Sequence, residues 1–310
     1  MARIEFGVMI RQEKTDFVHV REAAALCDEL GYDSIWLYDH LLGMGAPDQD
    51  IFEAWTLLAA LAPVTSRAKL GVMVTAAPFR HPPLLAKMAA TLDNISRGRL
   101  EFALGAGWYE PEFTAYGYPF PGARERIERL REAVLIVRAM WTEDRPTYAG
   151  KYYRIEGAYC NPRPLQKPHP PIIVGGAGEK FLLPTVAEVA DGWNCPATSA
   201  GEIEHKLQVL EIHCRRFDRS VRDLILSEQT VCVIAETQRE LDEKLQKAKK
   251  RYGFFGDIER NGIVGTPPGC IEKIREKAAR GISKFTIFFS DTTKAETLAL
   301  FAKEVMAAFR

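Results

Sequence analysis

SIWLYDHL, at residues 34–41, joins a short apolar run to a polar Tyr-Asp-His triplet. A run of this length, rich in β-branched and aromatic residues, is typical of a buried strand. Similar runs recur along the chain and alternate with longer amphipathic stretches. This alternation is expected of β-crossover-β units around a parallel sheet, so the order of the segments decides the fold class.

The pattern predicts eight strands, near residues 4–10, 34–37, 69–74, 100–104, 172–174, 192–194, 224–234 and 284–289. Helical patterns lie at residues 17–30, 51–64, 83–95, 123–141, 179–189, 202–216, 238–251 and 268–279, with a terminal helix near 294–309. Strict alternation of eight strands with eight helices favours a closed (β/α)8 TIM barrel over an open sheet. Barrels of this size form one domain, so we predict a single domain over residues 1–310.

The alternation is interrupted at roughly residues 108–171, between the fourth and fifth predicted strands. Residues 148–155, with Gly150 at a turn, have the pattern of a small hairpin. Long excursions inside a compact domain are usually functional loops or lids. We therefore expect an insertion over the C-terminal mouth of the barrel.

Charge and composition indicate an ordinary soluble protein with a small-molecule partner. Lys plus Arg and Asp plus Glu each total 41, so no global positive field would recruit nucleic acid or an anionic membrane. The start, MARIEFGVMIRQEK, is typical of a first strand rather than a signal peptide, and no apolar run is long enough to span a bilayer. We expect a cytoplasmic protein.

The cysteines give no sign of a metal site or a disulfide framework. They are far apart and form no CxxC pair, and the chain has no HExxH or GxSxG motif. We predict that all six are reduced and buried, and that no metal is bound. They are Cys27, Cys160, Cys195, Cys214, Cys232 and Cys270.

Residues just after the second and third strands are candidates for chemistry, because the active face of a barrel lies at its strand C-termini. His40 can exchange a proton near neutral pH, and Asp39 offers a carboxylate beside it. The alternative is a helix cap at Asp39 with a histidine that only packs. Arg80 is a candidate anion contact, whereas His81, before Pro82 at a helix start, is expected to be structural.

The fourth strand leads into GAGWYEPEF, where Gly107 gives the chain freedom to cross the barrel rim. Trp108 is suited to walling a planar ring. Of the two acids that follow, Glu110 and Glu112, one is expected to face the site, unless both are solvated loop acids.

The fifth strand leads into VGGAGEK at residues 174–180, at the start of a predicted helix. Its glycines allow close backbone approach, and helical amides can face an anion, so a phosphate would fit. A purely structural turn remains an alternative. The candidate residues are Gly175, Gly176, Ala177 and Gly178.

Taken together, the segments at the strand ends resemble the bacterial luciferase-like monooxygenase superfamily, in particular its branch that uses the deazaflavin coenzyme F420. The resemblance runs nearly end to end. It is carried by SIWLYDHL (34–41), LGVMVTAAPFRHP (70–82), ISRGRLEFALGAGWYEPEF (95–113), NPRPLQKPHPPIIVGGAG (161–178) and ADGWN (190–194).

The resemblance implies that a tricyclic ring lies at the strand C-termini beside Asp39 and His40, with His40 as proton acceptor or donor. Glu112 matches a glutamate implicated in protonating or stabilising the reduced ring, and Glu110 is its rival. The resemblance also implies a non-proline cis peptide at Met73–Val74, in a bulge that supports the ring.

Further coenzyme contacts implied by the resemblance lie around this bulge and in the glycine loop. Val72 and Thr75 flank the bulge, and the backbone at residues 175–178 approaches the coenzyme phosphate. The loop continues with Glu179 and Lys180 and is one residue longer than in the sugar-phosphate dehydrogenases of the family. Their substrate contacts are therefore not carried over, and the substrate stays open.

The sequence leaves three candidate functions. The first is an F420-dependent oxidoreductase that moves a hydride between the deazaflavin and a small organic substrate. The second is an FMN-dependent monooxygenase that uses dioxygen, and the third is a flavin-binding protein without turnover. A homodimer is expected from the resemblance, with the apolar helices near 51–64 and 83–95 as candidate surfaces.

Overall fold

Eight parallel strands close into a barrel in the computed structural model, which describes residues 3–43, 46–291 and 294–310. β10 pairs with both β9 and β12, and β12 pairs with β1, which closes the sheet on itself. The predicted (β/α)8 TIM barrel is confirmed. In order around the barrel the strands are β1 (Glu5–Met9), β2 (Ser34–Leu37), β3 (Lys69–Val72), β5 (Leu100–Gly105), β8 (Ile172–Gly175), β9 (Gly192–Cys195), β10 (Ile225–Ile234) and β12 (Lys284–Phe289).

Two short strands were not predicted. The expected third strand stops at Val72, and β4 (Thr75–Ala76) resumes the pairing with β5 after a bulge. β11 (Ile263–Gly265) pairs with the last three residues of β10, which extend beyond the barrel. Strands of two or three residues are too short to show an alternating pattern, so the sequence gives no signal for them.

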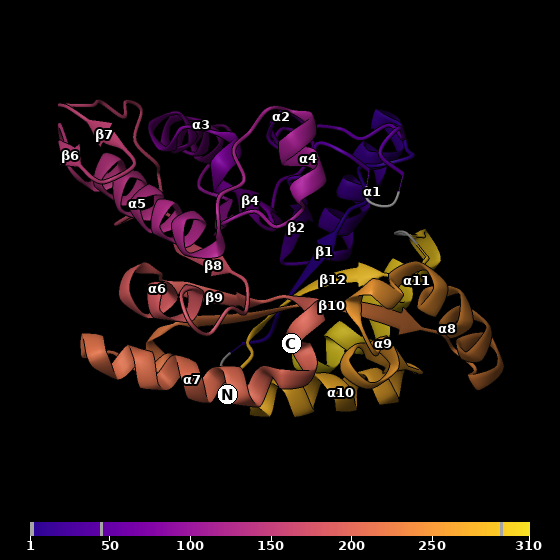
Figure 1. Ribbon diagram of the computed structural model, residues 1–310. Coiled ribbons are helices and arrows are strands. Elements are labelled where there is room, and N and C mark those ends of the chain that lie inside the picture. The colour runs from indigo at the N-terminus through magenta and orange to yellow at the C-terminus, as the bar shows by residue number, and fades with distance from the viewer. Residues whose placement is uncertain (1–2, 44–45, 292–293) are drawn as a thin grey trace.

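Helices surround the barrel, with α2, α3 and α5 on one side and α6, α7 and α10 on the other (Figure 1). Two short helices were not predicted, α4 (Glu110–Ala115) and α9 (Ile258–Asn261). Among the described residues, none of the helices combines the length and the apolar character needed to cross a bilayer. The longer helices are α1 (Phe17–Leu30), α2 (Ala54–Leu61), α3 (Pro82–Ile95), α5 (Ala123–Thr142), α6 (Leu182–Val189), α7 (Ile203–Cys214), α8 (Gln238–Tyr252) and α10 (Pro267–Ala279).

Some helix boundaries differ from the prediction. α6 begins at Leu182 rather than at residue 179, because the glycine loop continues further than expected. The terminal helix α11 covers only Ala295–Leu300 and continues as irregular helical turns. α1 matches its prediction, since the Asp16 side chain caps its first turn and Gly31, with a φ of 80°, ends it.

Successive side chains of a strand point to opposite faces, so outward and inward side chains pack in separate clusters. The outward-facing side chains pack with the helices in one large cluster. A smaller cluster, formed by Met9, Trp36, Met73, Ala103 and Ile173, fills the barrel interior. All six cysteines are buried and free, as predicted.

Below this apolar cluster, the strand starts carry a buried charged layer. The ammonium of Lys284 bonds to Glu101 and lies 3.2 Å from Glu5, while Lys69 lies 3.1 Å from Glu101. Burial alone would raise the pKa of Glu101, but the two ammonium groups outweigh it and hold that pKa below its ordinary value. The layer therefore closes the N-terminal end of the barrel with paired charges.

The insertion begins with α4 and α5 and ends in a hairpin of β6 (Tyr148–Ala149) and β7 (Arg154–Ile155). The predicted hairpin is present, but it packs on α5 at the outer edge of the fold (Figure 1). The carboxylate of Glu132 accepts backbone hydrogen bonds from Lys151 at 2.7 Å and from Tyr152 and Tyr153 at 3.0 Å. The insertion reaches the mouth through α4.

Replacing Lys284 by Met would leave Glu101 with one partly exposed partner, and we expect a loss of about 3–5 kcal/mol in the free energy of unfolding. Since the pKa of Glu101 is depressed, its stabilising effect is present above about pH 4.3 and is lost as the pH falls further. Urea unfolding at about pH 5 and pH 3 should show less acid sensitivity in Glu101→Gln than in the wild type.

The matched control for Lys284→Met is Arg239→Met, which breaks the exposed Arg239–Glu243 pair, 3.6 Å apart. It should change stability by less than about 0.5 kcal/mol. Equal losses in the two variants would contradict a stabilising role for the buried layer.

Candidate active site

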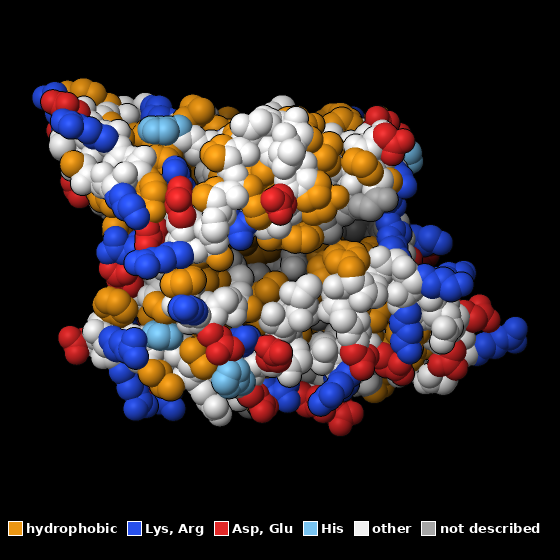
Figure 2. All heavy atoms as spheres, in the orientation of Figure 1, with side chains coloured by type: hydrophobic (Ala, Val, Ile, Leu, Met, Phe, Trp, Pro, Cys, Tyr) orange, Lys and Arg blue, Asp and Glu red, His pale blue; other side chains and the backbone are white. Residues whose placement is uncertain are grey.

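The C-terminal ends of β2, β4, β5 and β8 meet at one mouth of the barrel, because all strands are parallel. Figure 2 shows that this region is hollowed, below α4 and above the ends of β10 and β12 in that view. Every strand-end segment singled out in the sequence leads into this region. The inward cluster of Met9, Trp36, Met73, Ala103 and Ile173 lies beneath the opening and gives it an apolar floor.

His40 and Glu112 form a hydrogen-bonded pair at the mouth. Nδ1 of His40 lies 3.0 Å from Oε1 of Glu112, and the backbone N–H of Leu41 donates to Oε2 of Glu112 at 3.0 Å. Glu112 lies on α4 and is only 2% exposed. Because Nδ1 is held by the carboxylate, Nε2 is the nitrogen of His40 that remains for a ligand.

The two rival acids of α4 differ in their surroundings. Glu112 is buried against His40, whereas Glu110, the first residue of the helix, is exposed. The carboxylate of Glu112 is therefore placed to orient the imidazole. Direct protonation of a ring by either acid stays a prediction.

Aromatic side chains flank His40. The rings of Trp108 and Tyr109 lie edge-on to His40, with centroids 5.7 Å and 6.2 Å away. Trp108 is 61% exposed, which is unusual for so large an apolar side chain. Gly107 has a φ of 74°, and a Cβ there would lie 2.3 Å from the ring of Phe113, so the chain needs glycine to bring Trp108 to the rim.

Asp39 is placed differently from His40, although the two are adjacent in sequence. Its carboxylate is 4% exposed and accepts hydrogen bonds from Arg80 at 2.6 and 3.0 Å and from the backbone N–H of Ala76 at 2.8 Å. Burial raises the pKa of Asp39, while the Arg80 guanidinium opposes that rise. Both carboxylate oxygens of Asp39 already accept hydrogen bonds from the protein. The contact between Asp39 and a coenzyme ring stays a prediction.

Arg80 is not free for the anion contact considered from the sequence. Besides its two bonds to Asp39, its guanidinium bonds to Glu53, which caps the start of α2. Arg80 thereby ties the ends of β2 and β4 to α2. Glu53 was missed from the sequence because no local pattern links it to Arg80, 27 residues away. His81 precedes α3 and packs edge-on to Tyr153, in keeping with a structural role.

The bulge between β3 and β4 contains the predicted cis peptide at Met73–Val74. The Val74 side chain fills space that two glycines leave open, since a Cβ on Gly105 or on Gly175 would lie 2.5 Å from a Val74 methyl group. Met73 belongs to the interior cluster and Val74 packs against it. These two residues therefore reach the floor of the mouth.

The residues that flank the bulge, Val72 and Thr75, have different surroundings. The side chain of Val72 packs in the outer cluster, between strands and helices, and its coenzyme contact stays a prediction. The strand alternation that places Met73 inward turns Val72 outward. The hydroxyl of Thr75 is buried and has no protein partner among the described residues. Its coenzyme contact stays a prediction.

The glycine loop after β8 is held in place by several hydrogen bonds. The carbonyl of Gly176 accepts from Trp193 at 2.7 Å, and that of Gly178 accepts from the first two amides of α6. Gly176 has a φ of 132°, which favours glycine. Glu179 pairs with Lys206 and His205. Side chains of Val74 and Leu182 occupy the space beside Gly175 and Gly176, and the phosphate contact of the loop, with Ala177 at its centre, stays a prediction.

An aromatic set beside β12 was missed from the sequence. The short turn η5 (Gly253–Phe255) follows α8, and Phe255 packs on Phe288 of β12 with ring centroids 5.3 Å apart. Phe254 packs on Phe255 at 4.1 Å and is 55% exposed. The dipeptide Phe254-Phe255 after a polar helix is the only local signal, and it does not show which surface the rings cover.

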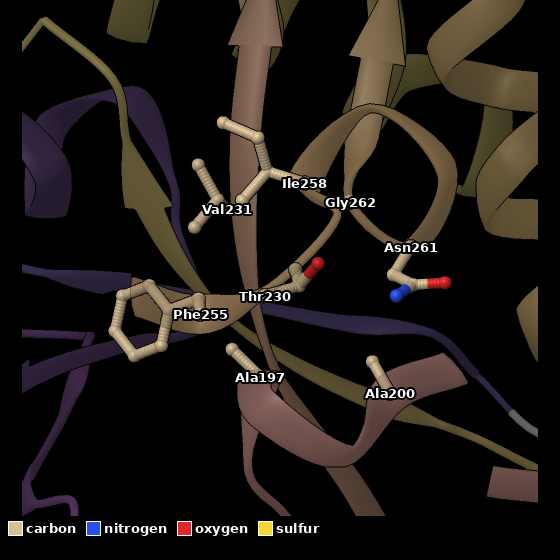
Figure 3. Close-up of a pocket in the computed structure, with 8 residues that line it drawn as sticks. All are labelled: Ala197, Ala200, Thr230, Val231, Phe255, Ile258, Asn261 and Gly262. Carbon is tan, nitrogen blue, oxygen red and sulfur yellow. The ribbon is translucent and has the colours of Figure 1, made fainter. Parts of the chain in front are cut away.

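A small pocket lies behind Phe255, away from His40. Figure 3 shows the Phe255 ring at one side of it, with Ala197 and Ala200 of η2 (Ala197–Glu202) opposite Val231 and Ile258. Because its lining comes from β10, η2, η5 and α9, it is separate from the His40 site.

Comparison with known proteins decides the family. The model of the luciferase-like monooxygenase family matches residues 1–260. The chain belongs to the luciferase-like monooxygenase family. The match includes β1 to β10, and with them His40, the bulge, Glu112 and the glycine loop.

Relatives of this luciferase-like protein differ in their coenzymes. An F420-dependent glucose-6-phosphate dehydrogenase of Intrasporangium calvum is 27% identical, with 91% of this chain and 92% of that protein covered. An FMNH2-dependent dimethylsulfone monooxygenase of Pseudomonas putida is 31% identical, over 82% of this chain and 70% of that protein. The chain spans about half the length of several other curated relatives.

Solved structures agree with the fold of the luciferase-like barrel. An F420-dependent secondary alcohol dehydrogenase, in complex with an F420–acetone adduct, superposes with a TM-score of 0.84 at 19% identity and 99% coverage of both chains. At that identity the likeness concerns the fold alone.

Replacing Gly105 by Ala should displace Val74, because the new methyl group would lie 2.5 Å from it. We expect a loss of about 1–3 kcal/mol in the free energy of unfolding, measured by urea denaturation, and weaker coenzyme binding in a titration. Gly269→Ala in α10 is the control, since nothing lies within 4 Å of its new methyl group. If Gly105→Ala were as stable as the control, the packing role of Val74 would be refuted.

Proposed function

We propose that this luciferase-like protein is an F420-dependent oxidoreductase that moves a hydride between the deazaflavin and a small organic substrate. The observation that carries the proposal is the His40–Glu112 pair, built beside the bulge at the mouth of the barrel. A relative named as F420-dependent, matched over nine-tenths of both chains, supports the choice of coenzyme.

The residues at the mouth fit such a coenzyme. Met73, Val74 and Ile173 offer an apolar floor, to which a planar ring is suited. In the 175–178 loop a Cβ on Gly178 would come no closer than 3.7 Å to Leu182, so this end of the loop is where backbone amides could meet a phosphate. A bound deazaflavin supplies a ring carbon that accepts or gives a hydride, and the protein supplies position and proton transfer.

In this proposal His40 moves the proton of the substrate. Donation from Nδ1 to Glu112 fixes the tautomer in which Nε2 accepts a proton, and the buried carboxylate stabilises the imidazolium that forms. The N–H of Leu41 holds the second carboxylate oxygen, so Glu112 cannot easily rotate away. Trp108 and Tyr109 limit the access of water beside the imidazole.

The second candidate is an FMN-dependent monooxygenase that uses dioxygen. It is favoured by the dimethylsulfone monooxygenase relative, which has the higher identity of the two long matches. Both reactions need a planar slot and a phosphate site, so the mouth suits either coenzyme. A flavin-binding protein without turnover is the third candidate. The buried His40–Glu112 pair argues against it, because holding a ring requires no oriented base.

Two further predictions concern the molecule as a whole. The homodimer stays a prediction, and α3 exposes Leu84 and Ile95, which offer an apolar surface for it. The cytoplasmic location also stays a prediction.

Titration of the apoprotein with F420 and with FMN, under one buffer and salt condition, tests the coenzyme. We expect micromolar or tighter binding of F420 and weaker binding of FMN, measured by fluorescence or calorimetry. Preference for FMN would move the protein to the monooxygenase candidate. Binding of neither would remove the basis for the proposed function.

Replacing His40 by Ala should lower kcat by about 10²–10⁴-fold for any accepted substrate, while coenzyme affinity stays near that of the wild type. Glu112→Gln should also lower kcat, because an amide does not stabilise a protonated imidazole. Glu110→Gln on the same helix is the comparison and should keep most of the activity. Loss of activity in Glu110→Gln alone would show that the acids have been assigned in the wrong order.

A further inference from the structure

Gln12 is a buried polar residue that was not singled out from the sequence. It follows the C-terminal end of β1 and is 0% exposed. We propose that Gln12 is a positioning residue for His40, which holds the end of β2 so that the imidazole meets Glu112. The inference rests on the proposed function, because it concerns the same proton transfer.

The polar groups of Gln12 are bonded to two segments of the chain. Its side-chain Oε1 accepts from the backbone N–H of Tyr38 at 2.9 Å, and its Nε2 donates to the carbonyl of Phe52 at 2.6 Å. Its backbone N–H donates to the hydroxyl of Tyr38 at 3.4 Å, and its carbonyl accepts from the N–H of Phe52 at 3.1 Å. Breaking any of these bonds would leave a buried polar group without a partner, so Gln12 fixes the positions of both segments.

The bond to Tyr38 is made at the point where the strand pairing of β2 ends. β2 pairs with β3 as far as Leu37, whose carbonyl accepts from the N–H of Met73 at 2.8 Å. The next N–H along the chain, that of Tyr38, donates to the Gln12 side chain. A side-chain amide has the same kinds of donor and acceptor as a peptide group, so Gln12 extends the hydrogen bonding of β2 by one residue.

Tyr38 connects Gln12 to His40. The rings of Tyr38 and His40 have centroids 6.2 Å apart, and Tyr38 also packs against the apolar cluster of the barrel interior. Only one residue separates the two in sequence, so a shift of the Tyr38 backbone would move His40 with it. The 3.0 Å bond from His40 to Glu112 depends on this placement, because Glu112 lies on a different segment, α4.

The bond to Phe52 completes a closed circuit of contacts around the end of β2. Phe52 precedes Glu53, whose carboxylate binds the guanidinium of Arg80. Arg80 also binds Asp39, which follows Tyr38 in the chain. Members of such a hydrogen-bonded network support one another. The end of β2 is therefore held at two successive residues, directly before the catalytic imidazole.

The test is the tautomer of His40, measured by ¹⁵N NMR of histidine-labelled protein without added coenzyme. The spectrum of His40→Ala assigns the signal. In the wild type, neutral His40 should carry its proton on Nδ1, because that nitrogen is bonded to Glu112. In Gln12→Met, which has a side chain of similar size but no amide, we expect a mixture of the two tautomers. An unchanged tautomer in Gln12→Met would overturn the inference.

Gln166→Met is the matched control. The side-chain amide of Gln166 donates to Asp93 at 2.7 Å and to the carbonyl of Leu100 at 2.8 Å. Leu100 is the first residue of β5, so these bonds lie at the opposite end of the barrel from His40. The control should lower the urea midpoint of unfolding and leave the His40 signal unchanged. If both variants altered the tautomer equally, general loosening of the fold would be the cause and the inference would be wrong.

Turnover with F420 and any accepted substrate gives a second measurement. Gln12→Met should lower kcat about 10- to 100-fold, because a small displacement of a catalytic group is enough to slow the reaction. Adding Gln12→Met to Glu112→Gln should lower kcat little further, since both residues act on the same imidazole. Fully additive losses would contradict the positioning role.

The outcomes separate this inference from the proposed function. If F420 does not bind, the proposed function fails, and the NMR measurement still decides whether Gln12 positions His40. If the wild type itself lacks the Nδ1 tautomer, the proposed role of His40 fails and this inference fails with it. If only the Gln12→Met spectrum is unchanged, the proposed function stands and the positioning role is wrong.

Discussion

The pairing of β10 with both β9 and β12 is the constraint on which the rest of the structure depends. It closes the sheet, so every strand ends at the same mouth and every inward side chain shares one interior. Residues from β2, β5 and β12, which are far apart in the chain, thereby come to face one opening. Without the pairing of β10 with β9 the sheet would be open, with β9 at one edge and β10 toward the other.

Within the barrel, charged and apolar side chains lie at different heights along the barrel axis. The lower level holds Lys284, Glu101 and their partners, and the level above it is apolar around Trp36 and Met73. Placing these ion pairs at the closed end keeps their charges away from the apolar floor of the mouth. A planar coenzyme can then meet an apolar floor, with His40 as the titratable group beside it.

The two carboxylates near the mouth have different roles, although both were first considered as groups that act on the coenzyme. Asp39 holds the backbone of β4 and the Arg80 guanidinium, and so supports the strand that carries the bulge. Glu112 binds the imidazole of His40. The first carboxylate maintains the shape of the site, and the second determines which nitrogen of His40 can act on a substrate.

The sequence by itself determined the barrel and most strand and helix positions, since these follow from the local apolar period, and the cis peptide at Met73–Val74 was expected from the family resemblance. The outward side chain of Val72 and the pairing of Asp39 with Arg80 could not be foreseen, because both depend on neighbours in space. The bond between His40 and Glu112 joins residues 72 positions apart, and Phe255 meets Phe288 only because η5 folds back onto β12. Such contacts come from the closure of the barrel, which no local pattern encodes.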